Sequence, residues 1–159
     1  MNNTNPKPQI PSLAIAILAA GKGKRMNNPS KTKVMFELNN KPMIGYVVET
    51  AQKLSPQKII LIVGWQKDSV IEYVSSIQKE IIFTEQKEQL GTGHAIMQIE
   101  NPLQDFSGNV LVLSGDVPLL SISTLQTLPP CSESHPTVRY GEGERRKEAD
   151  NFGFAKGHS

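Results

Sequence analysis

The chain lacks the features that mark secreted, membrane-spanning or strongly nucleic-acid-binding proteins. Its 159 residues include one cysteine, Cys131, which excludes an internal disulfide and a cysteine-rich metal site. No apolar run approaches the roughly 18 residues that a membrane-spanning helix needs. The formal net charge is only +2, so no strong field indicates nucleic acid or an acidic membrane as a partner. These absences favour a cytoplasmic protein whose ligands must be inferred from local sites.

Length and composition predict one domain with poorly ordered ends. A chain of 159 residues, 38% of them hydrophobic, can bury one substantial core. Residues 1–11 are rich in Asn and Pro and predict a disordered N-terminus, whereas residues 12–128 carry the apolar pattern of a globular domain. Residues 129–159 are rich in Ser, Gly and charge. They predict a weakly ordered tail, because they offer too little apolar surface to offset chain entropy.

Continuous apolar runs alternate with segments of helical periodicity. Buried parallel strands read as unbroken apolar runs, whereas helices place apolar residues three or four positions apart. On these criteria we predict strands at residues 13–18, 58–63, 81–83 and 109–113, and helices at 43–54, 69–77, 93–99 and 123–128. The residues of the second helix expected to face the core are Val70, Ile71, Val74 and Ile77. The order βαβαβαβα predicts an α/β fold with a Rossmann-like parallel sheet, right-handed crossovers and helices on both faces.

The loop after the first strand, residues 18–26 (LAAGKGKRM), has the composition of a nucleotide-binding turn. Gly21 and Gly23 permit a tight turn whose N–H groups can hold phosphate oxygens, and Arg25 would supply a forked cation. The loop is neither a Walker loop nor a dinucleotide fingerprint, because Met26 stands where the third glycine of G-x-G-x-x-G would be. A plain glycine turn between strand and helix is the competing interpretation.

A second motif, residues 86–95 (QKEQLGTGHA), follows the third predicted strand. The amides of Gln86 and Gln89 and the hydroxyl of Thr92 suit a site that reads the hydrogen-bonding edge of a base. Thr92 could also cap the helix that follows. A lone histidine such as His94 is more often structural than catalytic, and we favour the structural role.

A third motif, residues 114–118 (SGDVP), follows the fourth predicted strand, so each motif lies where ligands bind in open α/β sheets. Asp116 is well placed to bind Mg²⁺, which takes one or two carboxylates and completes its shell with phosphates and water. Capping of the following turn is an equally good interpretation of Asp116. Lys31 and Lys33 lie near the first motif, where loop lysines are usually solvated.

In this order the motifs resemble the N-terminal pyrophosphorylase domain of the bacterial bifunctional N-acetylglucosamine-1-phosphate uridyltransferase/glucosamine-1-phosphate acetyltransferase family. The family elements L-A-A-G-x-G-T-R-M, P-K-V, G-K-P-M, Q-L-G-T-G-H-A and G-D-V-P-L read here LAAGKGKRM, TKV, NKPM, QLGTGHA and GDVPL. The resemblance covers about residues 13–128. It implies a GT-A-like, Rossmann-like fold, Mg²⁺ as cofactor, and transfer of UMP from UTP to N-acetylglucosamine-1-phosphate. The implied products are pyrophosphate and UDP-N-acetylglucosamine, a precursor of peptidoglycan.

The resemblance also assigns site residues. It implies catalytic roles for Arg25, Lys33 and Asp116, with Asp116 as the magnesium ligand. The residues implied to bind the nucleotide are Leu18, Ala19, Ala20, Gly21, Gly23, Lys33, Gln86, Gln89, Gly91, Thr92 and Gly115. Lys31 competes with Lys33 for the phosphates, because the TKV element lies one residue further from the first loop than in the family.

No counterpart of the family's sugar-binding segments, distal metal ligand or hexapeptide-repeat acetyltransferase domain is recognisable. We therefore expect a chain that lacks the C-terminal half of the family domain, with apolar faces that favour self-association. Three functions stay open: a uridylyltransferase, a catalytically inactive nucleotide-binding remnant, and a relative that uses CTP or GTP.

Overall fold

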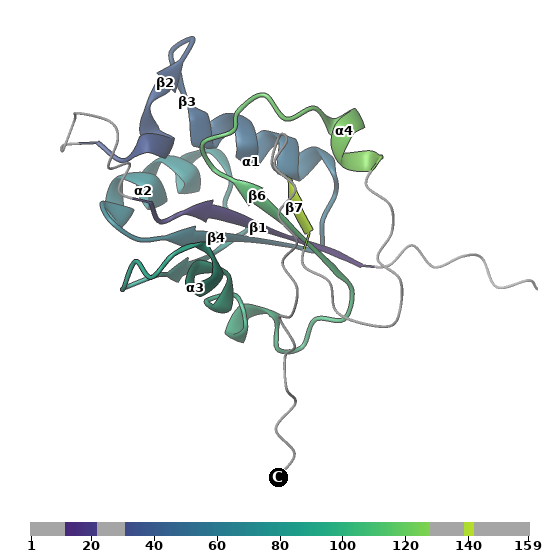
Figure 1. Ribbon diagram of the computed structural model, residues 1–159. Coiled ribbons are helices and arrows are strands. Elements are labelled where there is room, and N and C mark those ends of the chain that lie inside the picture. The colour runs from purple at the N-terminus through teal and green to yellow at the C-terminus, as the bar shows by residue number, and fades with distance from the viewer. Residues whose placement is uncertain (1–11, 22–30, 128–138, 142–159) are drawn as a thin grey trace, which may run out of the picture.

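The computed structural model describes residues 12–21 and 31–127, together with the backbone of 139–141. A five-stranded sheet forms its centre, in the order β5-β4-β1-β6-β7, and every neighbouring pair is parallel (Figure 1). The strands are β1 (Leu13–Ala19), β4 (Lys58–Val63), β5 (Ile81–Glu85), β6 (Asn109–Ser114) and β7 (Arg139–Gly141). The predicted parallel α/β sheet is therefore confirmed.

Helices cover both faces of this sheet (Figure 1). They are α1 (Met43–Lys53), α2 (Lys67–Ile77), α3 (Thr92–Met97) and α4 (Ile122–Gln126), with short 3-10 helices η1 (Lys33–Met35) and η2 (Asn101–Leu103). One buried cluster joins Ile15 and Ile17 of β1 to α1, α2 and α4. A second joins Ala16 of β1 to α3 on the opposite face. The period of two along β1 thus supplies both cores.

The strand order places a crevice at the carboxyl end of β1. The chain passes from β1 to β4 and β5 on one side and then returns to β6 on the other side of β1. The chain leaves β1 toward α1 on one face of the sheet and leaves β5 toward α3 on the other face. The carboxyl end of β1 lies between these connections, which is the position where open α/β sheets bind ligands.

Each strand and helix predicted from periodicity is present, with bounds that differ by one or two residues at most. The inward orientation predicted for Ile77 is wrong, because this side chain is 41% exposed. Ile77 is the last residue of α2, and the apolar stripe of the helix extends past the surface that covers Val70 and Val74. Ile71 packs against the core as expected.

The 3-10 helices η1 and η2, a short β-hairpin and strand β7 were not predicted. The hairpin of β2 (Glu37–Leu38) and β3 (Lys41–Pro42) turns at Asn39 and Asn40, whose φ angles of 49° and 61° suit a tight hairpin turn. Strand β7 pairs with β6 inside the segment expected to be a weakly ordered tail. The other predictions for residues 1–11 and 129–159 lie outside the described residues. No described helix is both long and apolar enough to cross a membrane.

Gly64, directly after β4, allows the first loop to pack against the sheet. A Cβ atom at Gly64 would lie 2.9 Å from both Ala20 Cβ and Ala20 O. We expect Gly64→Ala to lower the free energy of unfolding by about 1–3 kcal/mol, because the backbone at Ala20 must move to admit the methyl group. Urea denaturation measures this difference.

Gly21→Ala is the matched control, because a Cβ at Gly21 meets no atom of the described residues within 4 Å. Its stability should stay within about 0.5 kcal/mol of the parent chain. Equal destabilisation by the two substitutions would show that the contact with Ala20 is not the cause.

Candidate functional site

A cavity of about 380 Å³ opens at the carboxyl ends of β1 and β6, within the size range of small-molecule sites. Its lining combines apolar residues from the strands with polar residues from three loops. The lining residues are Leu18, Ala20, Gly21, Lys33, Val34, Gln86, Gln89, Gly91, Thr92, Ala95, Val112, Ser114 and Asp116. The three sequence motifs therefore converge on one space.

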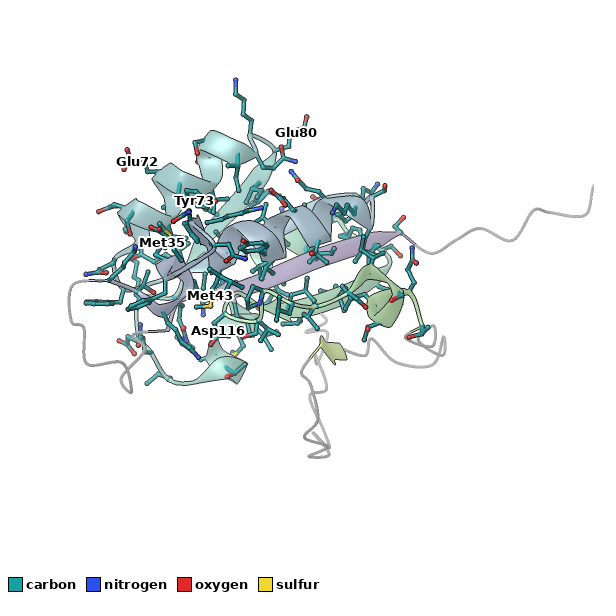
Figure 2. The ribbon with its side chains drawn as sticks, turned by 90° about the horizontal axis from the view of Figure 1, so that it is seen from above. Met35, Met43, Glu72, Tyr73, Glu80 and Asp116 are labelled. Carbon is teal, nitrogen blue, oxygen red and sulfur yellow. The ribbon has the colours of Figure 1, made fainter. Side chains whose placement is uncertain are left out.

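Gly115 fixes one wall of the cavity by its close approach to β1. Its N–H donates to Leu18 O at 2.9 Å, and a Cβ at this position would lie 2.8 Å from the same oxygen and 3.0 Å from Ile44 Cδ1. Only glycine fits this contact without a shift of the backbone. The contact continues the pairing of β1 with β6 and places Asp116 at the end of α1 that begins with Met43 (Figure 2).

Asp116 is held by two donors. Lys33 Nζ lies 2.6 Å from its Oδ2, and Ser114 Oγ donates to its Oδ1 at 2.6 Å. Partial burial raises the pKa of the Asp116 carboxyl, but the hydrogen bonds from Lys33 and Ser114 and the positive charge of Lys33 outweigh it, so the pKa lies below its usual value. Asp116 is therefore ionised at neutral pH and can bind a cation.

Two side chains hold the first loop in place. Thr32 is fully buried, and its Oγ1 donates to Gly21 O at 3.2 Å. Gln89 Nε2 donates to Ala20 O at 2.5 Å. Thr32 directly precedes η1, whose first residue is Lys33, so the same buried hydroxyl ties the position of the lysine to that of the loop.

Gln86 is the buried polar residue of the opposite wall, with 5% of its surface exposed. Its backbone N–H donates to Val63 O at 2.8 Å, which extends the pairing of β5 with β4. Its side-chain Nε2 donates to Gly91 O at 3.0 Å and lies 3.1 Å from His94 Nδ1. The glycine is required at 91, because its φ of 102° is unfavourable for other residues.

The structure brings nine of the assigned residues to the cavity: Leu18, Ala20, Gly21, Lys33, Gln86, Gln89, Gly91, Thr92 and Asp116. It does not bring Ala19 or Gly115, whose roles here are packing in the core and contact with β1. Gly23 and Arg25 lie outside the described residues. Lys33 lines the cavity, whereas Lys31 forms an exposed ion pair with Glu37 at 3.4 Å.

The contacts contradict helix capping by Thr92. The residue that caps α3 is Gly91, and Thr92 is already the first helical residue, with no side-chain cap. The Asp116 carboxylate bonds to the side chains of Lys33 and Ser114 and also accepts from a backbone N–H, so its capping of the turn stays open.

Sequence reasoning missed five residues of the site: Thr32, Val34, Ala95, Val112 and Ser114. Ser114 could have been found, because it ends a buried strand two positions before the assigned carboxylate. Val34, Ala95 and Val112 lie in apolar sequence patterns that are also typical of core positions, so the sequence does not mark them as cavity residues. Nothing in the sequence distinguishes a buried Thr32 from an exposed loop threonine.

Asp116 is the carboxylate in the cavity lining that would bind a magnesium ion. The described residues contain no group of three or more His, Cys, Asp or Glu side chains placed to hold a metal. Mg²⁺ accepts one or two carboxylates when phosphate oxygens and water complete its shell. The donor set therefore fits an ion that arrives with a phosphate ligand and does not fit a closed protein site.

The bond from Thr32 to Gly21 O gives a stability prediction. Thr32→Val keeps the size and branching of the side chain but removes its donor. The variant should lose about 1–3 kcal/mol of unfolding free energy if it leaves the Gly21 carbonyl unpaired in a buried position. Thr32→Ser keeps the hydroxyl and should lose less. A Val variant as stable as the parent in urea denaturation would contradict the contact.

The lowered pKa of Asp116 gives a pH prediction. Because the folded pKa lies below the ordinary value, the stability contributed by the carboxylate is present above about pH 4 and is lost as the pH falls through the folded pKa. Both partners are partly exposed, so we expect about 1 kcal/mol or less. The difference in unfolding free energy between the parent and Asp116→Asn should be constant from about pH 5 upwards and shrink below about pH 4. A difference that stays constant below about pH 4 would refute the lowered pKa of Asp116.

Comparisons with known proteins agree with this arrangement. The bifunctional protein GlmU of Neisseria meningitidis serogroup C is 44% identical over 117 residues, which cover 74% of this chain and 25% of that protein. GlmU of Gloeothece citriformis is 45% identical over 116 residues, again covering 25% of its length. The chain thus spans about a quarter of the length of these curated relatives.

Solved structures share the fold at lower identity. The inositol-1-phosphate CTP transferase from T. maritima superposes with a TM-score of 0.59 at 20% identity, covering 74% of this chain and 48% of that one. A family model described as a MobA-like NTP transferase domain matches residues 15–149, which include most of β1, the cavity loops and β7. The sheet, the converging motifs and this match agree, and the chain belongs to the MobA-like NTP transferase family.

Proposed function

We propose that the chain forms the nucleotide-binding part of a uridylyltransferase that transfers UMP from UTP to N-acetylglucosamine-1-phosphate. The observation that carries the proposal is the convergence of Lys33, Asp116 and Gln86 on one cavity. The 44% identity to GlmU supports the same reaction class.

The cavity has two chemically different walls, and they suit the two parts of a nucleoside triphosphate. Lys33 and Asp116 supply charge near the start of α1, where the phosphates would lie. Gln86, Gly91 and Thr92 supply neutral polar groups beside α3, where the base would lie. Small residues, Ala20 and Gly21, separate the walls and leave room for the ribose.

In the proposed reaction an oxygen of the sugar-1-phosphate attacks the α-phosphorus of UTP. A new P–O bond forms, the bond from the α-phosphorus to the bridging oxygen breaks, and pyrophosphate leaves with the electron pair. The attacking oxygen is already ionised, so no general base is needed. The protein contributes alignment of the reactants and neutralisation of charge, which can together lower the barrier by several kcal/mol.

Lys33 and Asp116 have linked roles in this proposal. Mg²⁺, when bound at Asp116, supplies positive charge to the triphosphate oxygens. A carboxylate engaged with a cation no longer needs Lys33, so the ammonium that lies 2.6 Å from Asp116 Oδ2 becomes available to a phosphate. Ser114 continues to hold the other carboxylate oxygen and keeps Asp116 in position.

CTP is the second candidate nucleotide. The CTP:phosphocholine cytidylyltransferase from Streptococcus pneumoniae shares the fold with a TM-score of 0.56 at 23% identity, covering 66% of this chain and 45% of that one. The T. maritima relative is also named for CTP. Identities this low establish the fold alone, so the choice of nucleotide rests on the wall that faces the base.

Pyrophosphate release tests the proposal. The full chain, given UTP, N-acetylglucosamine-1-phosphate and Mg²⁺, should release pyrophosphate, and Asp116→Ala should reduce the rate at least about a hundredfold because it removes the cation-binding carboxylate. The same assay with CTP, GTP and ATP compares the nucleotides.

Ser121→Ala is the matched control, since it removes a hydroxyl at the start of α4, outside the cavity lining. Its rate should stay close to that of the parent. Release no faster than in the Asp116→Ala variant would reject the transferase and leave a nucleotide-binding protein. Faster turnover with CTP would reject UTP as the substrate.

A further inference from the structure

We propose that His94 is a positioning residue that sets base specificity: it holds the Gln86 amide so that an acceptor oxygen faces the base. This inference rests on the proposed function, because it explains how the same cavity would select uracil over cytosine. His94 needs no contact with the nucleotide to act in this way.

The orientation of the Gln86 amide follows first from Gly91. The carbonyl oxygen of Gly91 can only accept hydrogen bonds, and it lies 3.0 Å from Gln86 Nε2. Rotation of the amide by half a turn would place Oε1 against this oxygen, so two acceptors would face each other. The donor end of the amide is therefore directed toward the loop.

His94 uses the second hydrogen of the same nitrogen. Its Nδ1 lies 3.1 Å from Gln86 Nε2, and a bond at this distance requires Nδ1 to accept. The imidazole is then neutral, with its proton on Nε2. Gly91 and His94 together occupy both N–H groups of the amide.

The remaining polar atom of the side chain is the acceptor Oε1. No donor among the described residues bonds to it, although Gln86 is only 5% exposed and lines the cavity. A buried acceptor without a partner is unfavourable until a ligand donates to it. The cavity thus presents an acceptor to whatever base it holds.

The bases differ at the ring nitrogen that would meet this acceptor. Uracil carries a hydrogen on N3 and can donate, whereas N3 of cytosine is itself an acceptor. Cytosine would place two acceptors together in a partly desolvated site, which strongly disfavours binding. Guanine also carries a ring N–H, so its larger size rather than its polarity would exclude it.

His94 is itself fixed by its helix. Gln98 Nε2 donates to the His94 backbone oxygen at 2.9 Å. The carbonyl of Gln98 accepts from Thr84 Oγ1 at 3.0 Å, which joins α3 to β5. These bonds hold the backbone of His94 and Gln98 in place beside β5.

The test is the ratio of dissociation constants for CTP and UTP, measured by calorimetry with the full chain. The parent should bind UTP at least about tenfold more tightly than CTP. His94→Phe keeps a ring but removes the acceptor, so the ratio should fall toward one, mainly through weaker UTP binding. His94→Asn offers Oδ1 as an acceptor and should restore part of the ratio.

Two further variants separate specificity from folding. Met97→Leu changes a neighbouring, 52% exposed side chain of α3 and should leave the ratio unchanged. Gln86→Leu removes the acceptor itself and should lose the same discrimination as His94→Phe. If His94→Phe fails to fold, His94→Asn and Gln86→Leu still test whether the Gln86 acceptor and its partner set the ratio.

The outcomes distinguish the inference from the proposed function. A parent chain that prefers UTP, with the same ratio in His94→Phe or with equal losses for both nucleotides, would overturn the role of His94 and leave the transferase proposal intact. A parent chain that binds CTP as tightly as UTP, or binds neither, would overturn both.

Discussion

The central position of β1 is the constraint on which the rest of the structure depends. This strand pairs with β4 on one side and β6 on the other, and Ala14, Ile15, Ala16 and Ile17 have no exposed surface. A strand buried on both faces must be apolar along its whole length, so polar chemistry is confined to its end. There Leu18 accepts from Gly115, and the cavity opens beside this contact.

This geometry separates the site into a charged half and a neutral half. Lys33 and Asp116 approach from the side of α1, and Gln86 and His94 from the side of α3. The charges of the first half are balanced within it, which lets the second half use hydrogen-bond polarity alone. The proposed phosphate binding and the proposed base selection therefore depend on different side chains.

The sequence predicted the elements whose signal is repeated over many residues. Buried strands appear as unbroken apolar runs, and each predicted run is a strand of the sheet. Ile77 was misjudged because periodicity describes a helix face but not where the neighbouring surface ends. The turn at Asn39 and Asn40 rests on two residues, and β7 depends on pairing with β6, a contact between segments distant in sequence.

The sequence predicted which loops form the candidate site, but not which atoms in those loops contact one another. Motif positions after strands were enough to bring nine assigned residues together, because parallel strands end at one edge of a sheet. The hydrogen bonds that orient these residues could not be predicted. They depend on separations such as that between Thr32 and Gly21, which only the folded backbone determines.

The ion pair between Lys33 and Asp116 places one positive and one negative charge side by side at the cavity. An anion that binds Lys33 leaves the Asp116 carboxylate without its partner. A cation that binds Asp116 likewise leaves Lys33 without its partner. A ligand that carries both charges, an anion accompanied by its own counter-ion, can exchange with the pair without leaving either side chain unpaired. The metal-bound triphosphate of the proposed function is a ligand of this kind.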